Sequence, residues 1–309
     1  KQYNVDFRVL DISKNELPEA EICFLRQVLQ QTHRTLESYE IPDARLEAEV
    51  ALMNVLRIPR QDIFSQQESE VTPQQEQALD EILARRQKRE PLAYILGYKE
   101  FYGINLLVNP NVLIPRPETE FLVEHTLFMA LMGMESADLV IADIGTGTGA
   151  IAINLGIHLP SARVYAIDNF DPVLDVTSYN VRSHNVTDRV TLLKGNLLEP
   201  LPEPVDVIVA NLPYIPSDRI PTLQPEIQWE PQTALDGGNN GLDLINQLLN
   251  QAADGKLKPH GVIILEIDPE QFEPVKQLAS QLFPESDITV EKDLAQMDRM
   301  LIINLSTEY

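Results

Sequence analysis

The stretch Asp143-Ile144-Gly145-Thr146-Gly147-Thr148-Gly149-Ala150 decides the fold of this chain of 309 residues. It follows the apolar run Leu139–Ile144 and precedes a helical pattern. Glycines between a strand and a helix allow a tight turn and let a nucleotide-like ligand approach the backbone closely. Gly145, Gly147 and Ala150 also fit the G-x-G-x-x-G/A dinucleotide pattern, so this turn alone leaves a dehydrogenase open.

Downstream of the turn, apolar runs alternate with helical patterns. The runs are Val164–Ile167, Val190–Leu193, Val205–Ala210 and Val262–Ile267. Continuous apolar strands that alternate with helices predict a mostly parallel sheet covered on both faces. Ile288–Glu291 and Met300–Leu305, joined by a charged turn, predict an antiparallel pair that closes the sheet.

Upstream of the turn, the pattern changes twice. Apolar residues recur at helical spacing over residues 17–90, and Thr72-Pro73-Gln74-Gln75 has the sequence of a capped helix start. The segment Gly97–Pro115 alternates apolar residues between turn signals, which predicts a β-hairpin. We therefore expect a helical domain over residues 17–96, a hairpin linker over 97–116 and an α/β domain over 117–309.

Composition narrows the possible partners. The chain carries 24 basic and 47 acidic residues, a net charge of −23. Because a duplex-binding surface needs cations for phosphate contacts, nucleic acid is not the expected partner, and we assign the basic run of residues 85–89 to a helix C-terminus. A single cysteine, Cys23, and the lack of any apolar stretch long enough for a membrane span predict a cytoplasmic protein with no membrane contact.

Side chains at the ends of the predicted strands give the chemistry. Asp168 ends the second strand, where a carboxylate can accept hydrogen bonds from ribose hydroxyls of either NAD or S-adenosylmethionine. Asp143 lies beside the glycine turn, where the cationic amino-acid end of a ligand could bind. Asn211-Leu212-Pro213-Tyr214 follows the fourth strand and offers an amide oxygen, a backbone carbonyl and an aromatic wall. Those groups can hold a planar NH₂ group.

An amide nitrogen is a poor nucleophile because its lone pair is delocalised into the carbonyl. Acceptors aimed at both N–H bonds localise the lone pair and align it with a methyl sulfonium, and positioning of this kind can contribute about 7–11 kcal/mol. This chemistry requires no metal and no nucleophilic side chain. The five histidines are scattered without the spacing of metal ligands.

Several further motifs show that the chain resembles the peptide chain release factor N5-glutamine methyltransferases of the HemK/PrmC type. In chain order they are Arg89–Gly97, Glu100-Phe101-Tyr102-Gly103, Leu113-Ile114-Pro115-Arg116-Pro117-Glu118-Thr119-Glu120, the glycine-rich turn, Asn211–Tyr214, Glu230-Pro231, Ala234-Leu235, Gly237-Gly238 and Gly241-Leu242. The resemblance runs from about residue 20 onward. It implies a class I S-adenosylmethionine-dependent fold, with a Rossmann-like and mostly parallel sheet whose last strand is antiparallel. It also implies a helical N-terminal domain that helps to hold a class 1 release factor.

The resemblance implies that the methyl acceptor is the glutamine of the release factor's Gly-Gly-Gln loop, with S-adenosylhomocysteine as the product. The implied cofactor site comprises Asp143, Gly145, Thr146, Gly147, Thr148, Gly149, Asp168, Asn196, Leu197 and Asn211. Asn211, Leu212, Pro213 and Tyr214 match the glutamine site, and Arg116 with its neighbouring prolines is expected to wall it. We expect a monomer.

The sequence departs from the family pattern at two places. The second residue of the catalytic loop is usually proline and here is Leu212, which keeps the backbone carbonyl in a less rigid loop. The segment expected at the adenine is commonly acidic-aromatic and here is Asn196-Leu197, which offers an amide oxygen and an apolar contact.

Three alternatives stay open beside a protein methyltransferase. A DNA or RNA adenine amino methyltransferase would need a basic cleft, and none is visible in the sequence. An NAD-dependent dehydrogenase is disfavoured by the Asn211 loop. A homologue that binds the cofactor but has been weakened catalytically by Leu212 is the third.

Overall fold

The computed structural model describes residues 23–132, 138–293 and 295–305. The chain forms two compact units, Lys1–Lys88 and Arg89–Tyr309, which are described separately. The part of the predicted helical region at residues 17–22 lies outside the described residues. Within the ranges given, no helix has the length and apolar content needed to cross a bilayer.

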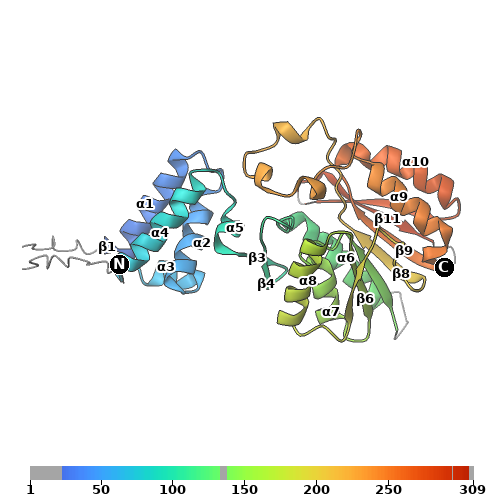
Figure 1. Ribbon diagram of the computed structural model, residues 1–309, viewed down its shortest axis with the longest axis horizontal. Helices are drawn as coiled ribbons and strands as arrows, with labels where there is room; N and C mark the ends of the chain where they lie inside the picture. The colour runs from blue at the N-terminus through green and yellow to red at the C-terminus, as the bar shows by residue number, and fades with distance from the viewer. Residues whose placement is uncertain (1–22, 133–137, 294, 306–309) are drawn as a thin grey trace, which may run out of the picture. The chain divides into compact units, whose positions relative to one another are not determined.

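The first unit is a small helical bundle (Figure 1). Its elements are β1 (Cys23–Phe24), α1 (Leu25–Ser38), α2 (Ala44–Leu56), α3 (Arg60–Ser65), β2 (Glu70–Val71) and α4 (Pro73–Arg86). Leu36, Leu52 and Ile63 are among the side chains that form its core. The prediction of helix throughout was wrong at β1 and β2, which pair antiparallel. Beside this pair, the first amides of α1 donate to carbonyls of residues 67 and 69, which satisfies donors that have no partner inside a helix.

The start and the end of α4 confirm the sequence interpretation. Thr72 Oγ1 accepts from the Gln75 amide at 3.3 Å, and the Thr72 amide donates to Gln75 Oε1 at 2.9 Å, which is the predicted capping box. The helix ends inside the basic run, at Arg86. Arg86 is 1% exposed and donates to both carboxylate oxygens of Glu47, at 2.6 and 3.1 Å. This cation therefore has a structural role in the first unit.

The second unit is built on a seven-stranded sheet. Its strands are β5 (Val140–Ile144), β6 (Arg163–Asp168), β7 (Val190–Lys194), β8 (Val205–Ala210), β9 (Leu257–Glu266), β10 (Asp287–Lys292) and β11 (Asp298–Asn304). The spatial order is β10-β11-β9-β8-β5-β6-β7, and the pairings from β9 to β7 are all parallel. β11 is antiparallel to both of its neighbours. The predicted parallel sheet with its antiparallel last strand is confirmed.

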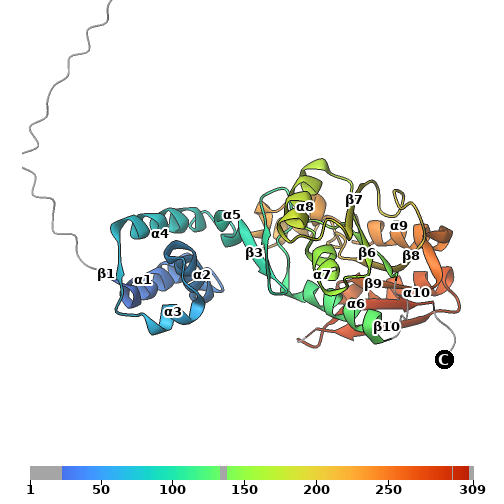
Figure 2. The ribbon, with the colours of Figure 1, turned by 90° about the horizontal axis from the view of Figure 1, so that it is seen from below.

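Helices cover both faces of this sheet (Figure 2). They are α6 (Glu120–Met132), α7 (Ala150–His158), α8 (Asp171–Ser183), α9 (Asp243–Gln251) and α10 (Phe272–Leu282). Side chains of α6, α7 and α8 pack with Ile141 and Val207 on one face, and side chains of α9 and α10 pack with Ala142 and Ile208 on the other. Every residue of β5 is buried, as expected for a mostly apolar strand covered on both sides, and this includes Asp143.

Short elements join these layers. The 3₁₀ helices are Pro117–Thr119, Ile220–Thr222, Ile227–Trp229, Gln232–Ala234 and Pro269–Gln271, and Ala252–Lys256 forms a π-helical turn. The predicted hairpin is present as β3 (Tyr98–Phe101) and β4 (Ile104–Leu107), and α5 (Leu92–Leu96) precedes it. The side-chain amide of Asn180 on α8 bonds both the Leu107 amide and its carbonyl, at 2.8 and 3.1 Å. The hairpin is thus fixed to the second unit, which begins at Arg89 and includes α5.

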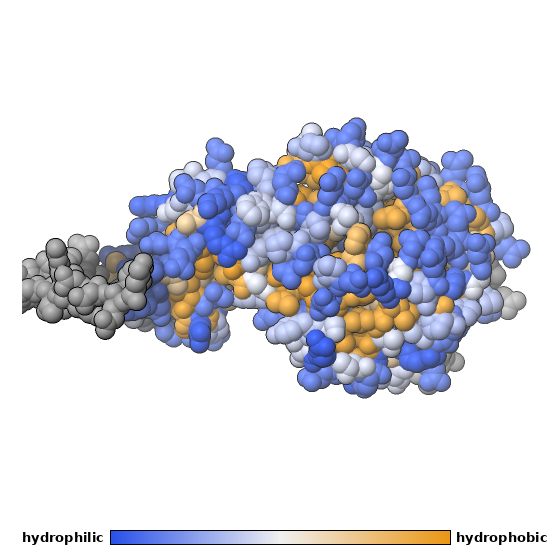
Figure 3. Space-filling view, in the orientation of Figure 1, coloured by the Kyte–Doolittle hydropathy of each residue, from blue (hydrophilic) through white to orange (hydrophobic). Residues whose placement is uncertain are grey.

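In the view of Figure 3 the surface is largely hydrophilic, with apolar patches of limited extent. The 24 basic and 47 acidic residues of the sequence contribute to this polar surface.

Candidate functional site

A pocket opens at the carboxyl ends of the neighbouring strands β5 and β8. From β5 the chain continues to β6 and β7 on one side of the sheet, and from β8 it continues to β9 on the other side. Open α/β sheets bind ligands at such a switch point. The pocket includes about 750 Å³ of free space, open solvent at its mouth included. Its wall includes Gly145, Gly147, Asp168, Phe170, Asn196, Leu197, Asn211, Leu212 and Pro213.

The glycine-rich turn is held in place by backbone contacts. Gly145 and Gly147 have φ angles of +70° and +56°, which L side chains rarely adopt. The amides of Gly145 and Thr146 both donate to the Ile167 carbonyl at 2.9 Å, and Thr177 Oγ1 donates to the Gly147 carbonyl at 2.7 Å. These bonds fix the turn to β6 and α8.

Asp143 lies beneath this turn and is not part of the pocket wall. Its carboxylate is 1% exposed, and one oxygen accepts from Thr146 Oγ1 at 2.6 Å and from the Ala152 amide at 3.1 Å. Burial raises the pKa of Asp143 to about 7, and these two hydrogen bonds oppose the rise. The carboxylate braces the turn from inside.

Three other predicted cofactor residues, Thr146, Thr148 and Gly149, also lie outside the pocket wall. Thr148 accepts a hydrogen bond at its carbonyl from Asn180 Nδ2 at 2.9 Å. Gly149 has a φ of +82°, and a Cβ on it would lie 2.9 Å from Ile153 Cδ1. These residues shape the turn, whereas Gly145 and Gly147 face the pocket.

Asp168, at the end of β6, lines the pocket as the sequence predicted. Burial raises its pKa, and backbone amides that include those of Phe170 at 3.2 Å and Gly147 at 3.4 Å oppose this. Its carboxylate therefore lies where the end of a strand meets the glycine turn. This is the position from which ribose hydroxyls can be bound.

Asn196 and Leu197 follow β7 and form another part of the wall. Asn196 Nδ2 donates to Glu199 Oε1 at 3.1 Å, and Leu197 is buried with a φ of +52°. The apolar contact expected of Leu197 is thus available. The aromatic side chain in the pocket wall is Phe170, two residues after Asp168.

The loop after β8 brings Asn211, Leu212 and Pro213 to the pocket. Leu212 is buried, and a Cβ on Gly145 would lie 3.2 Å from Leu212 Cδ2. Tyr214 lies outside the pocket wall. Its hydroxyl donates to Glu266 Oε1 at 3.2 Å. The predicted catalytic loop and glycine turn are therefore in contact.

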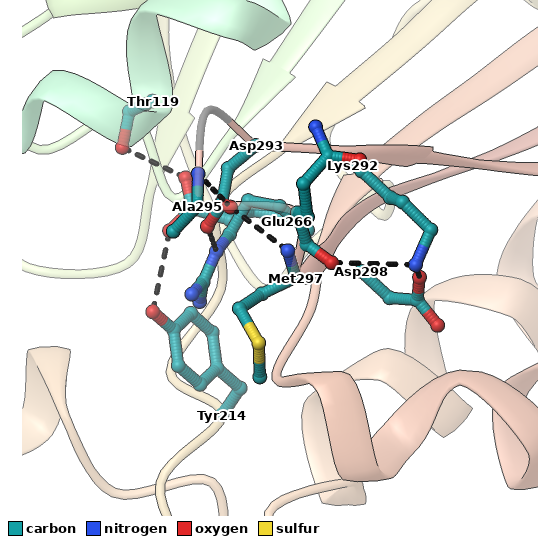
Figure 4. A network of polar contacts seen from close by, with 10 residues as sticks. Thr119, Tyr214, Glu266, Lys292, Asp293, Ala295, Met297 and Asp298 are labelled. Carbon is teal, nitrogen blue, oxygen red and sulfur yellow. Dashed lines mark hydrogen bonds and ion pairs between the residues drawn. The ribbon is translucent and has the colours of Figure 1, made fainter.

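A buried polar network lies behind this loop (Figure 4). Thr119 Oγ1 donates to Glu266 Oε2 at 2.8 Å. Asn211 Nδ2 in turn donates to Thr119 Oγ1 at 2.9 Å. Burial raises the pKa of Glu266, and the hydrogen bonds from Thr119 and Tyr214 and the charge of Arg299 oppose the rise. The pKa of Tyr214 is raised by burial and by the charge of Glu266.

Sequence reasoning missed the part played by Thr119 and Glu266. Glu266 is the last residue of β9, an acidic side chain at the end of an otherwise apolar run. That position puts it at the same edge of the sheet as Asp168 and Asn211. The signal that revealed Asp168 would therefore also have revealed Glu266.

Arg116 lies outside the pocket wall and binds Glu230. The Glu230 side chain is 1% exposed, and its second oxygen accepts from the Ile114 amide at 3.0 Å. Glu230 thus ties the segment around Arg116 to the loop that follows β8.

Gly237 and Gly241, later in the segment between β8 and α9, allow the backbone to pack closely on the catalytic loop Asn211–Tyr214. A Cβ on Gly237 would lie 2.6 Å from the Pro213 carbonyl oxygen, and one on Gly241 would lie 2.1 Å from that of Tyr214. Gln271 Nε2 donates to the Tyr214 carbonyl at 2.8 Å. The backbone of residues 213 and 214 is therefore fixed from two sides.

The strand order, the glycine turn and the loop after β8 define a class I S-adenosylmethionine-dependent methyltransferase fold. Two crystal structures of the hMettl16 catalytic domain, in complex with MAT2A 3′UTR hairpins 1 and 6, share this fold. Their TM-scores are 0.54 and 0.53 at 16% and 17% identity, with 74% and 66% of this chain and 82% and 77% of those chains covered.

Comparison of sequences identifies the family. A model of the PrmC N-terminal domain matches residues 27–97, and a model of ribosomal protein L11 methyltransferase (PrmA) matches residues 125–229. The release factor glutamine methyltransferase of Moorella thermoacetica is 40% identical over 279 residues, which are 90% of this chain and 97% of that protein. The one of Geobacter sulfurreducens is 38% identical over 263 residues, which are 84% and 90%. The chain belongs to the release factor glutamine methyltransferase family, which decides against the dehydrogenase.

Proposed function

We propose that this protein transfers a methyl group from S-adenosylmethionine to the side-chain amide nitrogen (N5) of the glutamine in the Gly-Gly-Gln loop of a class 1 peptide chain release factor. The observation that carries the proposal is the position of Asn211 and Leu212 in the wall of the pocket at the switch point, in a chain that belongs to the release factor glutamine methyltransferase family. The N–CH₃ bond forms as the S–CH₃ bond breaks, the amide nitrogen releases one proton, and S-adenosylhomocysteine would be the second product.

The pocket residues fit S-adenosylmethionine. Asp168 provides a carboxylate for the ribose hydroxyls, and Gly145 and Gly147 let a ligand approach the backbone. Asn196 and Leu197 offer a polar and an apolar contact to the adenine. When bound, the cofactor supplies a methyl group on a positively charged sulfur, which leaves without acid catalysis.

Two acceptors in the catalytic loop would orient the glutamine. The Asn211 side-chain oxygen and the Leu212 carbonyl can each accept one N–H of the primary amide. This localises the nitrogen lone pair toward the methyl group. A secondary amide or a lysine ammonium would mismatch this pair of acceptors. The proposed reaction needs no metal, because positioning and the charge of the leaving group account for the chemistry.

The helical region of residues 17–96 is proposed to contact the release factor, with residues 97–116 as a linker and residues 117–309 as the catalytic domain. A protein partner is in keeping with the net charge of −23, which makes a polyphosphate partner unfavourable. We propose that the protein acts as a monomer in the cytoplasm.

A methyl-transfer assay tests the proposal. The protein is incubated with labelled S-adenosylmethionine and either release factor or DNA, alone and in competition. Label should enter the Gly-Gly-Gln glutamine, and Asn211→Ala should abolish this while its unfolding curve stays close to wild type. Asn250→Ala, at an exposed position on α9, is the matched control and should retain turnover. Label in adenine with none in the glutamine would overturn the proposal and leave the fold unaffected.

A further inference from the structure

The side-chain amide of Asn211 has a defined orientation because of the groups behind it. Its Nδ2 donates to Thr119 Oγ1 at 2.9 Å, and that hydroxyl donates its only hydrogen to Glu266 Oε2 at 2.8 Å. The second oxygen of Glu266 accepts from the Tyr214 hydroxyl at 3.2 Å. Thr119 and Glu266 are 5% and 2% exposed, so water does not compete freely for these bonds.

The direction of each hydrogen bond follows from the donors and acceptors available. Both carboxyl oxygens of Glu266 accept, one from the Tyr214 hydroxyl and the other from the Thr119 hydroxyl, which uses the hydrogen of Thr119. A hydroxyl whose hydrogen is already used can only accept from a further partner. Asn211 therefore has to turn its NH₂ group toward Thr119, and its carbonyl oxygen points away from that hydroxyl.

The orientation matters because the two ends of an asparagine amide are opposite in chemistry. With the oxygen turned away from Thr119, Asn211 can present an acceptor to a substrate N–H. With the amide rotated by half a turn, it would present a donor to a group that also donates. The rotated form loses the bond to Thr119, because its oxygen would meet a hydroxyl that has no hydrogen left to give.

We infer that Thr119 and Glu266 are positioning residues that set the orientation of the Asn211 side-chain amide, so that its oxygen faces the acceptor nitrogen of the substrate. Thr119 donates its hydrogen to Glu266 and can therefore only accept from Asn211. Neither Thr119 nor Glu266 lies in the pocket wall. This inference rests on the proposed function for its catalytic consequence. The orientation of the amide itself can be measured in the free protein.

Thr119→Val keeps the shape of the side chain and removes the hydroxyl, whereas Thr119→Ser keeps the hydroxyl. Turnover of Thr119→Val should fall by about 100-fold, the effect expected of a misplaced catalytic group, and Thr119→Ser should recover most of it. The KM for release factor and the affinity for S-adenosylmethionine should change little. Thr126→Val is the matched control, because Thr126 is buried on α6 and its hydroxyl bonds only the Leu122 carbonyl of the same helix in the structure as described.

Side-chain amide NMR of the protein without substrate gives a readout that does not depend on activity. The Asn211 NH₂ signals, assigned by their loss in Asn211→Asp, should exchange slowly with solvent in wild type and in Thr119→Ser. They should shift and exchange faster in Thr119→Val, and Thr126→Val should leave them unchanged. Unchanged Asn211 signals in Thr119→Val, or wild-type turnover by that variant, would overturn the inference. A wild-type protein that gives the expected NMR result but does not methylate release factor would overturn the proposed function instead.

Discussion

The side chain of Leu212 closes over Gly145: a Cβ placed on that glycine would lie 3.2 Å from Leu212 Cδ2. Gly145 belongs to the turn after β5 and Leu212 to the loop after β8, so this contact joins the two loops that form the pocket. Position 145 favours glycine for two reasons: its φ is +70°, and a side chain there would crowd Leu212.

Gly145→Ala should therefore weaken cofactor binding beyond the cost of backbone strain. The left-handed conformation costs an L residue about 1–2 kcal/mol, and the new methyl group would also displace Leu212. Gly103→Ala is the matched control, because Gly103 has a φ of +76° with no atom within 4 Å of the added Cβ. Calorimetry should show reduced S-adenosylmethionine affinity for Gly145→Ala alone. Equal affinities for the two variants would show that the contact has no effect on the pocket.

Leu212→Pro restores the residue that is usual in the family and should be tolerated. The backbone carbonyl of residue 212 is retained, and proline favours the extended conformation for the residue before it, which here is Asn211. We expect a folded protein whose turnover is of the same order as that of wild type. A folded but inactive Leu212→Pro protein would mean that this loop works in another geometry.

The sequence was informative wherever a strand end determines the position of a side chain. Asp168 and Asn211 meet at one pocket because parallel strands bring their carboxyl ends to the same edge. It was less informative about which way a side chain turns. Asp143 was expected at the ligand, and its carboxylate instead braces the turn from below. The bond between Thr119 and Glu266 joins residues 147 positions apart, and no local pattern encodes such a partner.

Two-residue strands are a second limit of the sequence. β1 and β2 are too short to show the alternation of apolar and polar residues that marks a strand, and only their pairing defines them. The hairpin β3–β4, with four residues in each strand, was long enough to be recognised.

Asp168→Ala should weaken cofactor binding while the fold is retained. Loss of a hydrogen bond to a charged group costs about 1.5–3 kcal/mol, which corresponds to roughly 10- to 150-fold in affinity. Asp171→Ala is a suitable control, because Asp171 lies three residues further on, is exposed and pairs with Lys194 outside the pocket. Calorimetry should separate the two variants. Unchanged affinity in Asp168→Ala, or tight NAD binding by the wild type, would contradict the assignment.

Arg116→Ala should destabilise the protein, because it leaves the buried carboxylate of Glu230 without its cation. We expect a loss of about 1–3 kcal/mol in the free energy of unfolding. The double variant Arg116→Ala/Glu230→Gln removes the unpaired charge and keeps an acceptor for the Ile114 amide. It should therefore recover most of the stability that Arg116→Ala loses. Denaturant unfolding measures both effects. A double variant no more stable than Arg116→Ala would rule out the ion pair as the cause.

Turnover of the same double variant decides the predicted role of Arg116 at the substrate site. If Arg116 acts only through Glu230, stability and turnover should recover together. If its guanidinium contacts the release factor, stability should recover and KM for the release factor should stay high.

The buried carboxylate of Asp143 should make the stability of the protein depend on pH. Its pKa is about 7 in the folded state and has the ordinary value of 3.8 when the chain unfolds. Between these values the folded state holds a proton that the unfolded state has lost, so the contribution to stability is full below about pH 4 and is lost as pH rises through about 7. Three pKa units at 1.36 kcal/mol each give a loss of up to about 4 kcal/mol.

Asp143→Asn isolates this effect from the other carboxylates. One oxygen of Asp143 accepts both hydrogen bonds, and the asparagine oxygen can take its place without carrying a charge. The free energy of unfolding, measured with denaturant at pH 4.5, 6 and 7.5, should therefore fall less steeply with pH in Asp143→Asn than in wild type. Asp175→Asn, at an exposed position of α8, controls for the loss of one charge and should follow the wild-type curve. Parallel curves for Asp143→Asn and wild type would show that the buried carboxylate does not hold its proton in the folded state.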